Sequence, residues 1–204
     1  MEISVDGNRR DVASMPATMG DLISDLKCEL LDSGRVVLSL AVDGRAVDAR
    51  YENEIAGRPV SDFQGITLST ADPKTLCLAT LEEVANHIQP IIDESARISE
   101  LIDQGRHSQA MGRIMPCLEV WGAVITAIHN IAQLMQVNLD EVSTGEESLT
   151  DSIRALVSVM QSIKAAMDSR DLVSIRDALK HEMPETAHRI AAQLDALSNM
   201  VAAK

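Results

Sequence analysis

Residues 35–48 read RVVLSLAVDGRAVD, and this stretch decides the fold of the first third of the chain. The run from Val36 to Val42 is rich in β-branched and apolar residues, which favour an extended strand. Asp43 and Gly44 then form the dipeptide that most readily supplies the positive φ angles of a tight hairpin turn. The stretch therefore predicts a β-hairpin, with a second strand after the turn.

A second Asp-Gly turn stands near the start of the chain. Ile3 and Val5 alternate with polar residues before the turn at residues 6–7. Residues 9–13 are expected to return beside them as a second strand. The N-terminal segment thus predicts another hairpin.

One helix and one further strand complete the first part of the chain. Thr18 and Asp21 have the spacing of a helix cap, apolar residues follow at helical intervals, and Gly34 provides a stop. After a loop, Ile66 and Leu68 alternate with polar residues and indicate a last strand.

This order of elements within residues 1–75 resembles the ubiquitin-like β-grasp fold. Family members that are conjugated to other proteins, or that carry sulfur, end in a free Gly-Gly tail. Here residues 69–83, STADPKTLCLATLEE, contain no such tail and run on into the next segment. The resemblance therefore implies the other common use of the fold, which is docking to another protein.

From Thr80 onward the apolar period changes to 3.6 residues, which is typical of helices. The expected helices span about residues 80–105, 108–136, 149–167 and 172–201. The last of these contains Pro184, but its apolar stripe stays in phase, so we expect one kinked helix and no loop. Short connections between the helices predict an antiparallel four-helix bundle at residues 80–204. The predicted fold class is α+β.

Three segments of the helical part, QAMGRIMPCLEVW, VNLDEV and DLVSIRDALKHEMPETAHRI, are similar to a bacterial helical domain with no assigned function. The similarity concerns core spacing and turns, and it implies no catalytic residue.

Composition limits the partners and the cellular compartment. The 204 residues carry a formal net charge of -13, which repels nucleic acids and anionic membrane surfaces, so protein partners are expected. Three cysteines without C-x-x-C spacing indicate a reducing cytoplasm. Residues 117–135 are apolar enough to span a bilayer but contain Glu119 and His129, so a buried bundle helix is expected instead.

The strongest candidate for a metal site is HEMPETAH at residues 181–188, in which Glu185 and His188 are three apart. Di-iron bundles need this Glu-x-x-His motif on two helices, with all ligands pointing into the core. The chain has one copy, and His181, Glu185 and His188 fall on the polar side of the predicted helix. We therefore expect a solvated polar face, and predict no metal-binding, cofactor-binding or catalytic residue.

Trp121, the only tryptophan, has two possible roles: a core residue, which is the commoner case, or an anchor for a partner. Met111 and Met115, on the same predicted helix, are either core residues or part of an adaptable binding surface. We treat these three residues as candidates for partner binding.

These observations favour a non-enzymatic cytoplasmic protein: an adaptor or an assembly factor with chaperone-like activity, which binds a protein partner. A second copy of the chain, in a homodimer, is left open as such a partner. The alternative is a metal- or ligand-dependent enzyme or sensor that uses the interior of the bundle.

Overall fold

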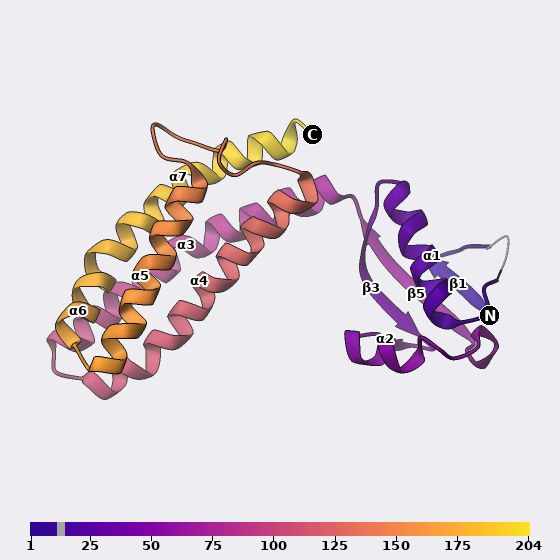
Figure 1. Ribbon diagram of the computed structural model, residues 1–204, viewed down its shortest axis with the longest axis horizontal. Coiled ribbons are helices and arrows are strands. Elements are labelled where there is room, and N and C mark those ends of the chain that lie inside the picture. The colour runs from indigo at the N-terminus through magenta and orange to yellow at the C-terminus, as the bar shows by residue number, and fades with distance from the viewer. Residues whose placement is uncertain (12–14) are drawn as a thin grey trace. The chain divides into compact units, whose positions relative to one another are not determined.

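The computed structural model describes residues 1–11 and 15–204 of the chain (Figure 1). It divides into two compact units, Met1–Leu76 and Cys77–Lys204. The first is an α+β unit built on a mixed sheet, and the second is helical. The fold class is therefore α+β, with the sheet preceding the helices.

The described residues of the first unit form a sheet with the strand order β2-β1-β5-β3-β4. β1 and β5 are parallel, and the other neighbouring pairs are antiparallel. The strands are β1 (Glu2–Val5), β2 (Asn8–Arg9), β3 (Val36–Val42), β4 (Arg45–Ala46) and β5 (Gly65–Ala71). Both predicted hairpins are present. The returning strand of the first was predicted at residues 9–13 but is found at Asn8–Arg9, and residues 12–13 of that prediction lie outside the described residues.

The aspartates of both Asp-Gly turns also hold the central strand β5. Both adopt positive φ, 52° at Asp6 and 50° at Asp43. The Asp43 carboxylate accepts hydrogen bonds from the backbone N–H groups of Gln64 (2.7 Å) and Gly65 (2.8 Å), where β5 begins. Asp6 accepts from both the hydroxyl and the backbone N–H of Thr70 (each 2.7 Å), where β5 ends. These bonds from Thr70 lower the pKa of Asp6.

Helix α1 (Met19–Asp32) packs its apolar stripe on the sheet. As predicted, the hydroxyl of Thr18 caps it by accepting from the backbone N–H of Asp21 (3.2 Å), and Gly34 follows its end with φ at 74°. The buried cluster that joins helix and sheet includes Ile3, Met19, Leu22, Ile23, Leu26, Leu30, Val42, Ile66 and Leu68.

Helix α2 (Ala49–Ile55) was not predicted. The Asp48 side chain caps it by accepting from the backbone N–H of Tyr51 (2.7 Å). Ile55 is the single fully buried residue of this helix, so the segment has no apolar stripe that would distinguish it from a loop. A short 3₁₀ turn (Val60–Asp62) then leads to β5.

The first residues of α3 (Pro73–Asp103) still belong to the first unit, and the rest of this helix belongs to the helical unit. The helical unit continues with α4 (His107–Met135), α5 (Leu149–Ser169), α6 (Leu172–Asp177), a π-helical turn (Ala178–Glu182) and α7 (Met183–Ala202). The predicted start of the first helix at Thr80 was wrong, because α3 already begins at Pro73. Proline suits a first helical position, where no N–H donor is needed, and the Asp72 carboxylate accepts from the backbone N–H of Thr75 (2.8 Å).

The backbone is helical without a loop from Leu172 to Ala202, as predicted for this segment. The π turn that immediately precedes α7 was not foreseen. Pro184 has no N–H to donate to the carbonyl group of Lys180, and its ring crowds that carbonyl in a regular α-helix. The wider π turn accommodates the proline without ending the helix.

Candidate functional site

Helix α4 exposes three large apolar side chains. Met115 and Val120 are each 40% exposed and Leu134 is 39% exposed. Residues 114–135 contain one acidic residue, Glu119, and no lysine or arginine. Among the described helices, α4 is the one long and apolar enough to cross a bilayer, yet only 39% of its most apolar window is buried. The fold therefore leaves much of its most apolar helix uncovered.

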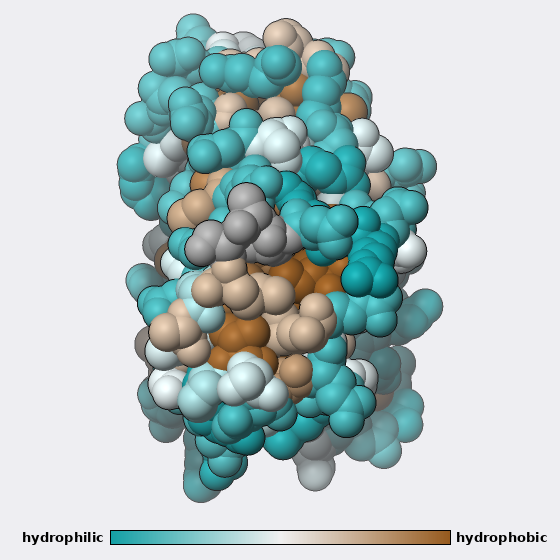
Figure 2. Space-filling view, turned by 90° about the vertical axis from the view of Figure 1, so that its right-hand side faces the viewer, coloured by the Kyte–Doolittle hydropathy of each residue, from teal (hydrophilic) through white to brown (hydrophobic). Residues whose placement is uncertain are grey.

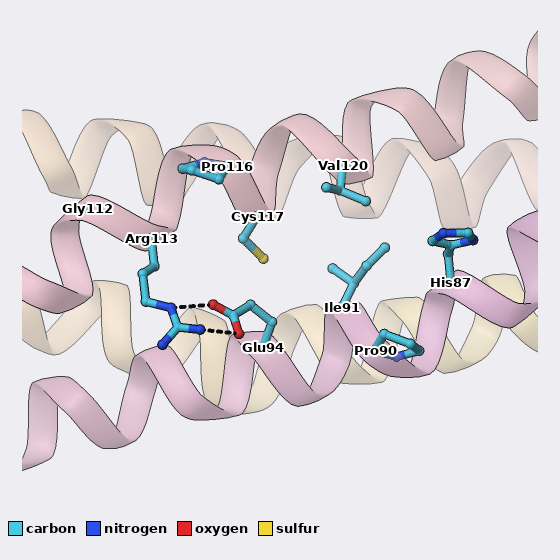
Figure 3. A pocket seen from close by; sticks show the side chains of 9 residues that line it. All are labelled: His87, Pro90, Ile91, Glu94, Gly112, Arg113, Pro116, Cys117 and Val120. Carbon is cyan, nitrogen blue, oxygen red and sulfur yellow. Dashed lines mark hydrogen bonds and ion pairs between the residues drawn. The ribbon is translucent and has the colours of Figure 1, made fainter.

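A groove of about 380 Å³ lies between α3 and α4 (Figure 3). Its lining residues are His87, Pro90, Ile91 and Glu94 from α3, with Gly112, Arg113, Pro116, Cys117 and Val120 from α4. A second hollow of about 300 Å³ shares His87 and Val120 with it and continues between the same helices to Thr80 and Ala127. We call the two together the α3/α4 groove.

An ion pair closes one end of the α3/α4 groove. The Arg113 guanidinium donates to both carboxylate oxygens of Glu94, at 2.6 and 2.8 Å, and Figure 3 shows this pair bridging the two helices. Both side chains are partly exposed, so the pair contributes about 1 kcal/mol at most to stability. Its main effect is to hold two charged groups against each other and away from the apolar part of the groove.

The floor of the groove carries a thiol. Cys117 is 4% exposed, and its Sγ lies 3.5 Å from the Oγ of Ser95, whose hydroxyl donates to the carbonyl of Ile91 at 2.9 Å. Burial raises the pKa of the Cys117 thiol. The group therefore stays protonated near neutral pH, and it behaves as a small apolar residue without the reactivity of a nucleophile.

The walls add hydrogen-bond acceptors to this apolar surface. Pro90 and Pro116 lie in opposite helices and lack N–H groups, so the carbonyls of Asn86 and Gly112 lose their usual donors within each helix. The Nδ1 of His87 lies 2.7 Å from the carbonyl oxygen of Glu83. Because a carbonyl can only accept, Nδ1 is the donor, and Nε2 of a neutral His87 is a further acceptor. The groove can thus take apolar groups along its floor and donors along its walls.

The three predicted partner-binding residues fall in different places. Trp121 is 0% exposed and lies in the core of the helical unit, so it is not available as a surface anchor on the folded chain. Met111 is partly buried against the same core. Met115 is exposed but is not among the residues that line the groove. The sequence did not single out His87, Pro90 and Val120 as binding residues. The apolar residues on more than one face of α4 were the one feature of the sequence that pointed to a binding surface on this helix.

His181, Glu185 and His188 are exposed, as predicted for the polar face of the last helix. Within residues 1–11 and 15–204, no group of three or more His, Cys, Asp or Glu side chains is arranged to hold a metal ion.

The first unit has a smaller apolar area. Met1 and Met15 are 37% and 47% exposed and line a hollow of about 350 Å³ together with Val60. Figure 2 shows apolar residues gathered on this side of the unit. Because Met15 directly follows residues 12–14 in the sequence, and these lie outside the described part, we assign no site to the area.

Fold and site together define a two-unit protein, in which an N-terminal sheet precedes a helical unit with an open apolar groove. A family model described as Domain of unknown function (DUF8042) matches residues 79–192, which is more than half of the chain, and the chain belongs to this family. Residues 1–72 match a second model, the TP0873 N-terminal domain. Comparisons with curated proteins and with solved structures gave no match.

Proposed function

We propose that this is a non-enzymatic adaptor or assembly factor, which uses the α3/α4 groove to bind an amphipathic helix of a partner protein. The observation that carries the proposal is the apolar groove itself, in which Val120 of the incompletely buried helix α4 is 40% exposed. The proposal treats the first unit as a β-grasp docking module, supported by its strand order around α1, and the second as an antiparallel four-helix bundle.

The dimensions of the groove suit a helix. From Gly112 to Ala127 it follows α4 for about 22 Å, at 1.5 Å per residue. That length accommodates about four turns of a partner helix, whose apolar residues recur at intervals of three and four. Donors at the edge of the same partner helix would meet the carbonyl group of Gly112, a lining residue whose usual N–H donor is missing at Pro116.

Charge favours a basic partner over a second copy of this chain. Glu83 lines the groove, and Glu119 directly precedes Val120. Within the described residues, neither glutamate makes an ion pair. The helical unit, residues 77–204, has 18 acidic and 10 basic residues, a net charge of -8. A second copy or an anionic bilayer would bring like charges together, whereas basic residues flanking the partner's apolar stripe would gain from this field.

The proposal extends to a small cytoplasmic chaperone for an exported or filament-forming subunit. Such a subunit has amphipathic helices that become buried only on assembly, and before assembly they need an apolar cover. An acidic protein with a shallow apolar groove provides one, and it releases its partner more readily than a permanent interface does.

The test compares Val120→Glu with Val173→Glu in the full chain. Both valines are exposed, at 40% and 58%, but only Val120 lines the groove. A pull-down from the native host first captures the partner protein. Synthetic peptides that together span the sequence of this partner are then prepared, and the affinity of each peptide is measured for wild type and for both variants. We expect one basic amphipathic peptide to become helical on binding and to bind Val120→Glu at least about tenfold more weakly, a cost of ~1.4 kcal/mol. Unchanged binding by Val120→Glu, or binding of an extended peptide, would contradict the proposal.

A further inference from the structure

A polar hollow of about 560 Å³ lies in the helical unit between the segment before α5 and the first turns of α7. Its polar lining includes Glu146, Glu147, Glu185, His188, Arg189 and Gln193. A backbone bridge between Ser143 and Ser148 shapes the segment on one side. The second half of HEMPETAH therefore lines a hollow of the helical unit.

Gln193 is the unusual residue of this hollow, because it is polar and only 2% exposed. Its Nε2 donates to the carbonyl oxygen of Glu147 at 2.9 Å. Since a carbonyl can only accept, this bond fixes the orientation of the amide and leaves Oε1 as the free acceptor. Among the described residues Oε1 has no partner. A buried acceptor without a donor is unfavourable, and in folded proteins it calls for a specific explanation.

The other groups of the hollow also leave acceptors in excess. Arg189 is directed to Glu147, with Nη1 3.2 Å from a carboxylate oxygen, and this pair joins the segment before α5 to α7. Glu146 and Glu185 are exposed and have no ion pair within residues 1–11 and 15–204. Among the described residues, the unpaired acceptors of the hollow are thus the carboxylates of Glu146 and Glu185 and the Oε1 of Gln193. The unpaired donors are the Nε–H of Arg189 and one group each on the side chains of Thr144 and His188, so acceptor atoms outnumber donors.

We propose that this hollow binds an organic cation with several N–H donors, a guanidinium or a primary ammonium group. Such a group gives Gln193 the donor that it lacks and neutralises the carboxylates of Glu146 and Glu185. An anion would meet both carboxylates, and in the described part of the chain no three His, Cys, Asp or Glu side chains are arranged to hold a bare metal ion. The cation belongs either to a free small molecule or to an arginine or lysine side chain of a protein. This site is separate from the α3/α4 groove and does not depend on the function proposed for it.

The test is calorimetric titration of the full chain with putrescine, with L-argininamide and with an acetylated, amidated Gly-Arg-Gly peptide. Tetramethylammonium is the control ligand, because it carries the same kind of charge without N–H donors. Glu185→Gln removes one exposed carboxylate from the hollow, and Glu182→Gln is its matched control, since Glu182 is also exposed but does not line the hollow.

We expect saturable binding that weakens at least about tenfold in Glu185→Gln and is unchanged in Glu182→Gln. Binding of the free amines identifies a small-molecule site, whereas binding of the peptide alone assigns the hollow to a protein side chain. The proposal is overturned if none of the three ligands binds at millimolar concentration, if tetramethylammonium binds equally well, or if the two variants behave alike.

Discussion

Replacing Trp121 with alanine should destabilise the helical unit strongly. The indole is 0% exposed, and removing a fully buried tryptophan from a core typically costs ~3 to 5 kcal/mol. Part of this loss is recovered, because the indole Nε1 has no hydrogen-bond partner among the described residues and its removal relieves ~1 kcal/mol or more of unfavourable burial. We therefore expect a net loss of ~2 to 4 kcal/mol.

Two further variants test this reasoning. Trp121→Phe keeps a buried ring and removes the unpartnered N–H, so it should cost less than about 2 kcal/mol. Val120→Ala removes a side chain that is 40% exposed, and alanine favours the helix, so stability should change by less than about 1 kcal/mol.

The assay is urea unfolding followed by circular dichroism at 222 nm, with the fluorescence of the wild-type protein recorded over a range of concentrations. At a typical slope of about 2 kcal/mol per molar urea, Trp121→Ala should lower the helical transition midpoint by ~1 to 2 M. The wild-type emission should be blue-shifted and independent of concentration. A Trp121→Ala midpoint within about 0.3 M of wild type, or emission that shifts on dilution, would refute the assignment of Trp121 to the core.

Three other outcomes are expected. Iodoacetamide should alkylate the exposed Cys28 much faster than Cys117, whose thiol is buried and has a raised pKa; mass spectrometry of the digested protein measures both rates, and equal rates would contradict the buried position. Asp6→Asn should destabilise the first unit at neutral pH, because hydrogen bonds from Thr70 lower the pKa of Asp6 in the folded state. That difference in urea stability should shrink as the pH falls below about 4, and a difference independent of pH would rule out the carboxylate as its source. Pro184→Ala should leave the protein folded with unchanged or slightly higher helicity by circular dichroism, whereas loss of folding would show that the proline is required for the π turn.

Much of the fold could be predicted because its signals are local. The Asp-Gly turns, the Thr18 cap and the limits of α4 depend on a few adjacent residues or on a long apolar period. Helix α2 is too short to show an apolar period and has no buried stripe. Its capping residue, Asp48, is the one local feature that could have indicated it. The π turn before Pro184 arises from a clash between a ring and a carbonyl, which an apolar pattern does not record.

The candidate site could not be predicted to the same extent. Helix α4 carries apolar residues on more than one face, and its sequence does not say which face the other helices cover. Trp121 and Val120 are adjacent in sequence, yet one is 0% and the other 40% exposed. The width of the space between α3 and α4 depends on how the helices pack. The hydrogen bond from Gln193 to the carbonyl of Glu147 depends on it too. These are tertiary properties that neither composition nor spacing contains.

The most direct test of the central claim is photo-crosslinking from inside the groove. A benzophenone amino acid is placed at Val120, or at Val173 as an exposed control, and the full-length protein is irradiated in its native host. We expect the Val120 probe to crosslink to the apolar face of one amphipathic helix in one partner, located by mass spectrometry, and the Val173 probe not to do so. No crosslink at Val120, or the same products from both positions, would contradict a helix-binding groove between α3 and α4.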